Sequence, residues 1–421
     1  MALRLGLVGA GGMGMRHAEG YIELRRHFDS FRMVAVCDVH LPAAESVAAD
    51  VEKATGERSK VYTDLDRMLD EARLDVLDIV TDTRMHHKFA CAAFERGVHV
   101  LTEKPMGVTV RACQVMKQAA AKHRRVLSVA ENYRRDPMNR LTKALIEAGA
   151  IGQPYFMERI SLGGGSALMH NTGWRALKSR AGSFIIEQGV HDADLMIYFL
   201  GDVETVYAET GLFTRTRKRA PMSPGLARFY GHRVEDQFPG QHAVQIDQED
   251  SAFAVLRFAS GAIGHFSMSN ASHGHAVSVD TIHGSSGTLL PPPSRSGKSP
   301  VIKLEGREQP FTGEEALSLV PEWELDDITS TFWGGKRRMP SYEMSFTEID
   351  RKLIAIEYQE LAEAITGNSP VEVGPEMGMK ALALAYATLE SGMARKPVSM
   401  ADMLEGAVEG YQRDVNVANG L

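Results

Sequence analysis

Short apolar segments alternate with amphipathic segments through the first third of the chain. Continuous apolar runs predict strands at residues 3–8, 33–37, 76–80, 98–101 and 126–129. The stretches between these runs have the spacing of helices. Because apolar strands separated by helices are typical of a parallel sheet covered on both faces, the pattern predicts a doubly wound α/β domain of the Rossmann type. We place this domain at residues 1–133.

The pattern changes near Pro154, after which predicted strands follow one another directly. They cover residues 155–161, 205–209, 251–258, 263–269 and 278–283. Gly and Ser turns between them predict a mainly antiparallel sheet, with Gly261 in the turn of a hairpin. Helical spacing returns at 348–365 and 378–393. We therefore predict a second domain of the α+β class, with an open sheet, over residues 134–421.

Two polar segments interrupt the second predicted domain. Residues 214–248 and 291–342 are rich in Pro, Gly, Ser and charge, and neither has a steady hydrophobic period. Loops of this length inside a compact domain usually serve as lids, binding elements or oligomer contacts. We predict long loops at both places.

The overall composition narrows the class of protein. A length of 421 residues favours two domains, and 44% hydrophobic with 24% charged residues is ordinary for a globular protein. A net charge of −7 disfavours nucleic acid and anionic lipid as partners, and no apolar stretch reaches the roughly 18 residues of a membrane helix. Three cysteines without CxxC spacing, and no visible export signal, predict a cytoplasmic protein. The histidines show no spacing that demands a metal, so we expect none.

A glycine-rich loop follows the first predicted strand. Gly9, Gly11 and Gly14 form the pattern GxGxxG between that strand and a segment with helical spacing. In a dinucleotide-binding loop these glycines permit a tight turn, close approach of a pyrophosphate and close packing of the helix, whose N-terminus favours negative charge. The predicted cofactor loop consists of Gly9, Ala10, Gly11, Gly12, Met13 and Gly14.

Asp38 follows the second predicted strand, near the spacing of about 20 residues expected for a ribose-binding acid. A carboxylate at this position can accept hydrogen bonds from both ribose hydroxyls of NAD and would repel the 2′-phosphate of NADP. The sequence therefore favours NAD over NADP. The alternative is that Asp38 only braces a turn.

Further motifs resemble the Gfo/Idh/MocA family of oxidoreductases (glucose-fructose oxidoreductase/inositol dehydrogenase type). From Leu77 the chain reads LDIVTDTRMHHKFACAAFERGVHVLTEKPMGVTV, which is similar to the family's strand, His-bearing helix and EKP signature. Later segments resemble family landmarks in the expected order, namely NYRRDP from residue 132, WR from 174, EQGVHDAD from 187, EDSAFAVLRFASGAIGHFS from 249 and HGSSGTL from 283. Two departures are Asp82, where the family usually has proline, and Glu187, where aspartate is commoner.

The resemblance implies a Rossmann domain followed by a domain whose sheet closes a substrate pocket against the nicotinamide. Beyond the glycine loop and Asp38, it implies cofactor contacts at Thr81, Asp82, His86, Glu103, Lys104, Asn132, Trp174 and Arg175. For Trp174 and Arg175, simple packing is an alternative interpretation. The family also implies a homodimer or homotetramer joined through the open sheet.

The resemblance places Lys104, His191 and Glu187 around a reacting hydroxyl. We favour His191 as the general base, with Lys104 stabilising the developing alkoxide and Glu187 orienting or tuning the pair; the opposite assignment, with Lys104 taking the proton, stays open. Weaker candidates for substrate contacts are Arg134, His170 and Asn171.

These observations predict an NAD-dependent dehydrogenase that oxidises a secondary hydroxyl of a sugar, cyclitol or sugar derivative. One alternative is a redox-neutral enzyme that retains NAD while it cleaves a glycoside. Another is a regulator that binds NAD without turnover, which the presence of both Lys104 and His191 disfavours.

Overall fold

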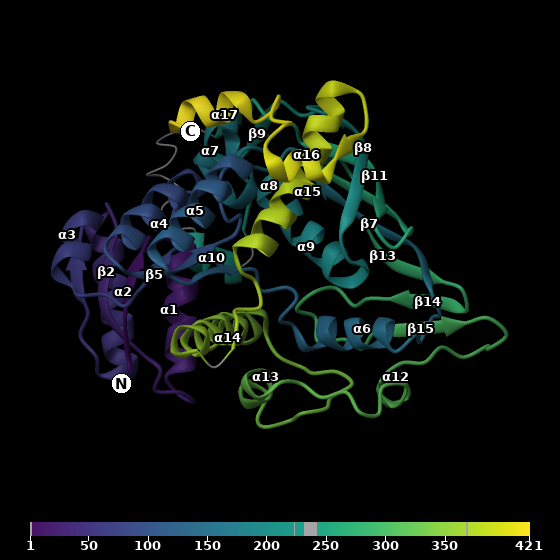
Figure 1. Ribbon diagram of the computed structural model, residues 1–421, viewed down its shortest axis with the longest axis horizontal. Coiled ribbons are helices and arrows are strands. Elements are labelled where there is room, and N and C mark those ends of the chain that lie inside the picture. The colour runs from purple at the N-terminus through teal and green to yellow at the C-terminus, as the bar shows by residue number, and fades with distance from the viewer. Residues whose placement is uncertain (1, 223, 231–241, 368) are drawn as a thin grey trace.

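The computed structural model in Figure 1 describes residues 2–222, 224–230, 242–367 and 369–421. It contains two large sheets with helices between and around them. The first is a six-stranded parallel sheet, and the second is an eight-stranded mixed sheet. None of the helices in the described residues is both long and apolar enough to span a membrane.

The parallel sheet has the strand order β3-β2-β1-β4-β5-β6 and confirms the predicted doubly wound class. Its strands are β1 (Leu3–Val8), β2 (Phe31–Cys37), β3 (Lys60–Tyr62), β4 (Val76–Ile79), β5 (His99–Glu103) and β6 (Leu127–Ala130). The sequence pattern missed β3, because this edge strand has three residues and only Tyr62 is buried. All six strands lie within residues 3–130, while the division of the chain at residue 133 stays a prediction.

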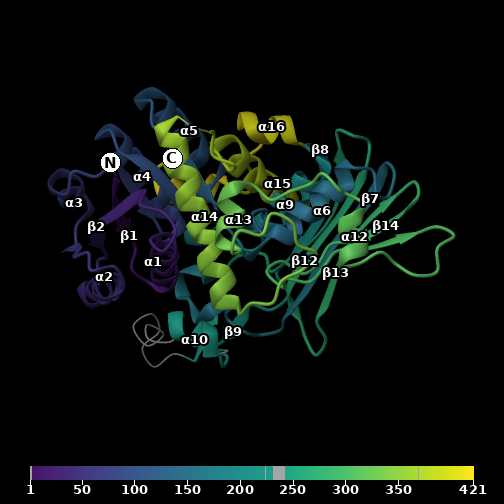
Figure 2. The ribbon, with the colours of Figure 1, turned by 90° about the horizontal axis from the view of Figure 1, so that it is seen from below.

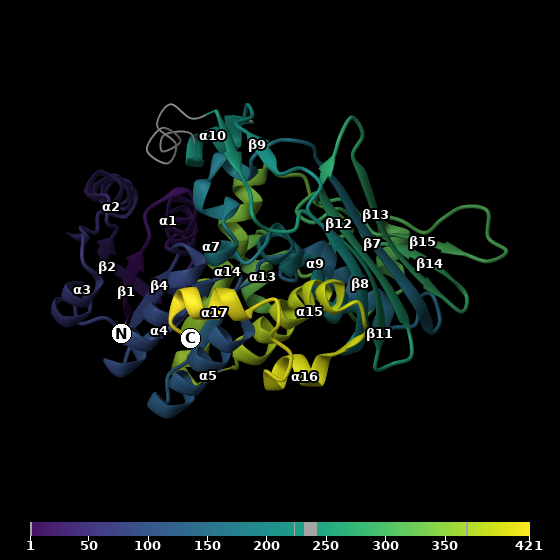
Figure 3. The same ribbon diagram turned by 90° about the horizontal axis from the view of Figure 1, so that it is seen from above.

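Helices cover both faces of the parallel sheet. They are α1 (Gly12–Leu24), α2 (Leu41–Thr55), α3 (Leu65–Glu71), α4 (His86–Glu95) and α5 (Val110–His123). Helices α1 and α2 pack together, and α4 packs against α5 on the opposite face (Figure 3). Short polar side chains cap several helices at their N-termini. Thr109 caps α5 and Asp64 caps α3 by accepting hydrogen bonds from backbone N–H groups that have no partner within the first helical turn.

The second sheet has the strand order β15-β14-β13-β7-β12-β11-β8-β16. Its strands are β7 (Pro154–Gly164), β8 (Val203–Gly211), β11 (Ser251–Phe258), β12 (Ile263–Ser272), β13 (Val277–Gly284), β14 (Gly287–Leu290), β15 (Val301–Leu304) and β16 (Val398–Ser399). The hairpin predicted at Gly261 is confirmed by the antiparallel pairing of β11 and β12. One neighbouring pair, β7 and β12, runs parallel, so the sheet is mostly but not wholly antiparallel.

One face of the second sheet packs against helices and the other is open. Helices α9 (Gly189–Leu200) and α15 (Pro375–Ala394) lie on the covered face, as Figure 3 shows. Large apolar side chains on the other face are exposed, namely Phe156, Tyr207, Phe253, Val255 and Ile263. We call this surface the open sheet face.

Helix α14 (Phe346–Thr366) returns from the second half of the chain to the parallel sheet. It lies along α1 (Figure 2), where a Cβ at Gly20 would be 2.4 Å from Ile354. Tyr358 of this helix donates a hydrogen bond to Asp78 of β4. Helix α14 begins with a capping box between Ser345 and Glu348.

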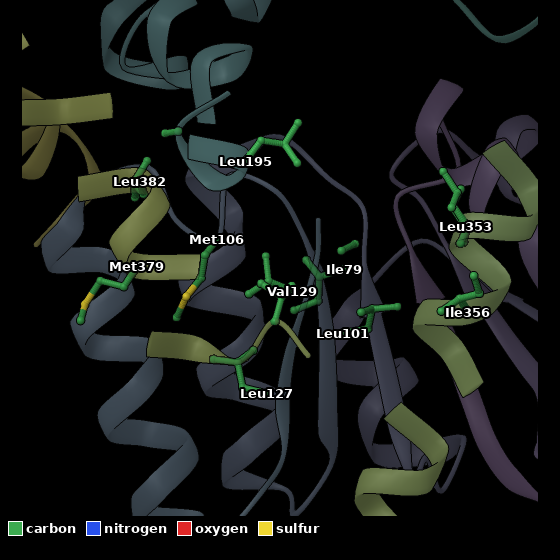
Figure 4. Close-up of a cluster of buried hydrophobic side chains, with 14 of the residues drawn as sticks. Ile79, Leu101, Met106, Leu127, Val129, Leu195, Leu353, Ile356, Met379 and Leu382 are labelled. Carbon is green, nitrogen blue, oxygen red and sulfur yellow. The ribbon is translucent and has the colours of Figure 1, made fainter. Parts of the chain in front are cut away.

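The hydrophobic core is continuous from α14 through the parallel sheet to α15. Figure 4 shows the sheet residues Ile79 and Leu101 with Leu353 of α14 on one side and Leu382 of α15 on the other. These side chains are fully buried. Two consecutive helices near the C-terminus therefore pack on either side of the parallel sheet.

The two polar segments contain short elements that the sequence did not predict. Residues 214–248 include β9 (Thr216–Lys218), α10 (Pro224–Tyr230) and β10 (Ala243–Gln245), while residues 223 and 231–241 lie outside the described part. Residues 291–342 include β15, α12 (Glu314–Ser318) and α13 (Asp327–Phe332). Elements of three to seven residues are too short to show a hydrophobic period, which is why both segments resemble plain loops in sequence.

Candidate active site

Two adjoining cavities lie at the carboxyl ends of the parallel strands. The larger has a volume of about 730 Å³ and the smaller about 230 Å³. Their walls share Met13, Thr81, Trp174, Arg175 and Tyr230, among other residues. Ligands of open parallel sheets bind at this edge, so the location agrees with a cofactor site that opens into a substrate site.

The glycine loop forms one wall of the larger cavity. A Cβ at Gly14 would lie 1.9 Å from the carbonyl oxygen of Gly9, and one at Gly12 would lie 2.5 Å from the ring of Tyr230. Only glycine fits at these positions. Gly9, Gly11, Gly12 and Met13 line the cavity, whereas Ala10 and Gly14 lie behind them. Helix α1 begins here without a side-chain cap, which leaves backbone N–H groups for an anionic ligand.

Asp38 also lines the larger cavity. Its Oδ2 accepts a hydrogen bond from the Ala10 amide at 2.7 Å, and its Oδ1 accepts one from the His40 amide at 2.8 Å. Each carboxylate oxygen can accept more than one hydrogen bond. Asp38 therefore braces the turn and still presents a carboxylate to the cavity, so the two interpretations of the sequence are compatible.

Of the three cofactor contacts predicted after β4, two line a cavity and one does not. Thr81 lines both cavities and Asp82 the larger one, where burial raises the pKa of the Asp82 carboxyl. His86 lines neither cavity. Its ring nitrogens lie 3.0 Å from the carbonyl oxygen of Pro105 and 3.3 Å from that of Thr81. The structure thus places His86 behind the site, between two backbone segments that form it.

Lys104 and His191 meet at the smaller cavity, as the sequence predicts. Lys104 Nζ donates a hydrogen bond to the backbone oxygen of Glu187 at 3.0 Å. His191 Nδ1 lies 2.7 Å and 2.8 Å from the two carboxylate oxygens of Glu131. The imidazole stacks on the ring of Tyr133, with 4.1 Å between centroids and 6° between planes. These contacts fix the ring and leave Nε2 as its remaining nitrogen.

Burial controls the protonation of this pair. Desolvation, followed by the positive charges of Lys104 and Arg295, lowers the pKa of His191 well below its ordinary value. Desolvation raises the pKa of Glu131 to about 7. The lowered pKa favours a neutral imidazole, and when Glu131 is ionised it accepts the proton on Nδ1, which leaves a lone pair on Nε2.

The carboxylate of Glu187, expected to orient or tune Lys104 and His191, has its hydrogen bonds to other residues. It accepts a hydrogen bond from Thr83 Oγ1 at 2.8 Å and one from Arg175 Nε at 3.1 Å. The acid that orients His191 is Glu131, which the sequence analysis missed. Because Glu131 directly follows β6, the strand-end rule that found Asp38 could have found it.

Two further predicted contacts do not reach the cavities. Arg134 Nε donates a hydrogen bond to Asp194 at 2.8 Å, and the guanidinium pairs with that buried carboxylate a second time. Asn171 exchanges two hydrogen bonds with the backbone of Ala220. Neither residue lines either cavity, so both have structural contacts where we expected substrate contacts.

The other predicted residues do line the site. Trp174 and Arg175 border both cavities, with the guanidinium carbon 4.2 Å from the indole centroid. His170 lines the smaller cavity and stacks on Tyr230 at 5.1 Å; burial lowers the pKa of its imidazole to about 3. Asn132 lines it too, and its Oδ1 is buried and has no protein partner among the described residues.

Glu103 links the EKP segment to α1. Its Oε1 lies 3.2 Å from His17 Nε2, and its Oε2 accepts the Lys104 amide at 2.8 Å. Burial opposes ionisation, but the hydrogen bond and charge of His17 lower the pKa of Glu103 to about 2. The sequence also missed Arg16, Tyr133, Arg295 and Phe346, which are among the other residues that line the smaller cavity.

The larger cavity has the features that a dinucleotide requires. Its glycine loop admits no Cβ at Gly12 or Gly14, its helix offers free N–H groups, and Asp38 provides acceptor oxygens. The unpartnered Oδ1 of Asn132 offers an acceptor at the smaller cavity. These residues fit NAD.

Comparison with known families matches both halves of the chain. Residues 3–131 match the Gfo/Idh/MocA model described as the oxidoreductase family, NAD-binding Rossmann fold. Residues 143–400 match the companion model, the C-terminal alpha/beta domain of the same oxidoreductase family.

Individual relatives agree with this result. A levoglucosan dehydrogenase of Pseudarthrobacter phenanthrenivorans is 30% identical over 291 residues, which cover 68% of this chain and 73% of that protein. Inositol 2-dehydrogenase 2 of Saccharopolyspora erythraea is 27% identical over 73% of this chain and 78% of its own length. A crystal structure of an NAD-binding oxidoreductase from Klebsiella pneumoniae has the same fold, with a TM-score of 0.74 at 22% identity over 95% of this chain and 99% of that chain.

Proposed function

The chain belongs to the Gfo/Idh/MocA family of NAD-dependent oxidoreductases, and from this premise we propose that it oxidises a secondary hydroxyl of a sugar, cyclitol or sugar derivative. The observation that carries the proposal is the convergence of Lys104 and the His191–Glu131 pair on the cavity that adjoins the cofactor site. The relatives named above, which act on levoglucosan and inositol, support a polyol substrate.

The larger cavity would hold the cofactor. The N–H groups at the start of α1 would bind its pyrophosphate, and Asp38 would accept hydrogen bonds from a ribose while disfavouring the 2′-phosphate of NADP. When bound, NAD supplies the acceptor for the hydride that leaves the substrate carbon. Trp174 and Arg175, which border both cavities, would help to exclude water between cofactor and substrate.

His191 acts as the general base in this proposal. Its Nε2 takes the hydroxyl proton, and Glu131 stabilises the imidazolium through Nδ1. Lys104 Nζ donates a hydrogen bond to the same substrate oxygen and stabilises its developing negative charge. The backbone oxygen of Glu187 holds the lysine, and its carboxylate holds Arg175.

The proposal is tested by incubating the purified protein with NAD and a panel of inositols, aldoses and glycosides while NADH absorbance and products are followed. We expect NADH to accumulate with at least one polyol, and Lys104→Ala and His191→Ala each to abolish that signal. Lys143→Ala is the control, because Lys143 pairs with Glu147 on α6 (Pro137–Glu147), away from both cavities.

Other outcomes would favour the alternatives. Release of an aglycone without NADH would favour the redox-neutral cleavage of glycosides. Tight binding of NAD without turnover of any compound would favour a regulator.

We also propose that the protein forms a homodimer or homotetramer through the open sheet face. Exposed Phe253 and Val255 on this face support the proposal, because contiguous exposed apolar side chains mark contact surfaces. Light scattering should give a dimer or tetramer that Val255→Glu dissociates; a monomeric wild type would contradict it.

A further inference from the structure

Two arginines that no motif identified line the smaller cavity. Arg16 comes from α1, and Arg295 follows β14 in the polar segment 291–342. Both side chains are mostly buried, with 11% and 15% of their surface exposed. Buried guanidinium groups require acceptors, so the partners of these two indicate what else the cavity binds.

Arg295 is held firmly in one position. Its Nη1 donates a hydrogen bond to Asp350 at 3.0 Å, and its Nη2 donates one to the Tyr133 hydroxyl at 3.1 Å. The guanidinium lies 4.8 Å from the ring centroid of Tyr133 and 4.9 Å from that of Phe346. Its backbone has a φ of 60°, which side-chain-bearing residues rarely adopt, and Asp136 accepts its amide N–H.

Arg16 uses the same carboxylate. Its Nε donates a hydrogen bond to Asp350 Oδ2 at 2.7 Å, and its Nη2 donates one to Oδ1. Among the described residues, its Nη1 has the thioether of Met13 as its hydrogen-bond partner, which is a weak acceptor. One aspartate therefore serves two guanidinium groups, and N–H donors remain for a further acceptor.

The charges are unevenly distributed around the cavity, and positive charge is concentrated at the two arginines. The wall carries four cationic side chains, those of Arg16, Lys104, Arg175 and Arg295, and the carboxylates of Glu103 and Glu187. Glu187 pairs with Arg175, and Glu103 faces His17, whose two carboxylate neighbours raise its pKa despite burial. Asp350 pairs with both Arg16 and Arg295, so the group formed by these three side chains carries one net positive charge.

We propose that the substrate is a sugar or polyol that carries a carboxylate or phosphate, and that Arg16 and Arg295 bind this anionic group. This inference rests on the proposed dehydrogenase function, because Lys104 and His191 of the same cavity receive the hydroxyl. Planar guanidinium groups match both anions through paired hydrogen bonds. A neutral sugar would leave the buried positive charge uncompensated.

The first experiment compares matched substrates: an aldose, the corresponding uronic acid and the corresponding sugar phosphate. We expect kcat/KM to be at least about 10-fold higher for one anion than for the neutral aldose, since a charge-assisted pair contributes a factor of about 10 to 100. The arms with uronic acid and phosphate distinguish the two anions. Equal or better oxidation of neutral sugars would overturn this inference and leave the dehydrogenase proposal intact.

The second experiment changes the arginine. Arg295→Met should lower the preference for the anion by about 10- to 100-fold, mainly through KM, and Arg295→Lys should restore part of it. Arg140→Met is the matched control: Arg140 also has 15% of its side chain exposed and also ties the polar segment to the rest of the chain, through Asp326, but it lines neither cavity. An unchanged preference in Arg295→Met would overturn the inference.

A binding measurement separates this inference from the proposed catalysis. Calorimetry with NAD-loaded protein would compare cyclohexanecarboxylate with cyclohexanecarboxamide, which have no hydroxyl to oxidise. We expect only the carboxylate to bind, and Arg295→Met to weaken it. If no polyol is oxidised but this binding holds, the dehydrogenase proposal fails and the anion site stands; binding of neither compound would overturn the anion site.

Discussion

The two cavities lie side by side but are built in different ways. One side of the larger cavity is made from short segments directly after parallel strands, where glycine packing and backbone N–H groups shape it, and residues of the second half of the chain such as Trp174 and Tyr230 close the other side. The smaller one gathers side chains from distant segments, including Arg16, Lys104, His191, Arg295 and Phe346. The strand-end side of the larger cavity follows from local sequence patterns, whereas most of the smaller cavity depends on contacts between distant segments.

The contrast extends to electrostatics. Groups at the smaller cavity have shifted pKa values in both directions, raised for Glu131 and lowered for Glu103, His170 and His191. Such groups, brought together by burial and charge, are characteristic of a reaction centre. We therefore expect substitutions in the smaller cavity to change turnover, and those in the larger cavity to change cofactor affinity.

The largest effect should come from His191→Ala. Removal of a general base costs about 10²- to 10⁴-fold in kcat. The affinity for NAD should stay the same, because His191 does not line the larger cavity. Steady-state kinetics and calorimetry with NAD measure the two quantities. His123→Ala, at the end of α5, is the control, and a fall in kcat smaller than tenfold would contradict the assigned role.

Asp38→Ala should change the affinity for NAD and leave kcat nearly unchanged, the opposite of His191→Ala. Loss of a charged acceptor should raise the KM for NAD by about 10- to 100-fold, with kcat at saturating NAD nearly unchanged. Asp38→Asn should in addition improve NADP relative to NAD, since the repulsive charge is gone. Glu45→Ala, on the exposed face of α2, controls for loss of a carboxylate. If the KM for NAD does not change, the cavity does not hold the ribose at Asp38.

The dependence of activity on pH tests whether Glu131 must be ionised for catalysis. Its pKa is raised to about 7, and the base requires it ionised, so kcat/KM should fall about tenfold per pH unit below this value. Glu131→Gln keeps an acceptor oxygen for His191 Nδ1 but cannot ionise. It should remove this acidic limb and lower kcat by roughly tenfold at neutral pH. A limb that persists in Glu131→Gln would belong to another group.

The smallest effect should come from Tyr358→Phe. The Tyr358 hydroxyl donates a hydrogen bond to buried Asp78, so its loss should lower the free energy of unfolding by about 1–3 kcal/mol. Because Tyr358 lines neither cavity, kcat and both KM values should remain close to those of the wild type. Urea denaturation measures the change, and Tyr155→Phe, at an exposed side chain of β7, is the control. A catalytic defect without loss of stability would contradict this division.

The sequence predicted the parts of the molecule that rest on local patterns. Five of the six parallel strands contain enough consecutive apolar residues to be recognised, and the glycine loop and Asp38 follow from strand ends. Lys104 and His191 were recognised from family motifs. The short edge strand β3 has only one buried residue and gives no such signal.

Glu131 could have been found from its position directly after β6, but the contacts of the other site residues could not, because sequence does not show where a side chain points. Arg134 belongs to a matched motif, yet its guanidinium turns toward Asp194. Arg295 lies in a segment without hydrophobic period, and its partner Asp350 is 55 positions later. A contact of that kind depends on tertiary packing, which no local pattern encodes.

The position of α14 has a consequence for synthesis of the protein. The ribosome releases the strands of the parallel sheet long before residues 346–366, whose apolar side chains cover α1 and the sheet. Until then the part of that face that α14 buries beside α1 stays exposed to chaperones and proteases. A premature stop upstream of Phe346 would therefore yield a fragment that retains the glycine loop but lacks the helix that completes its layer.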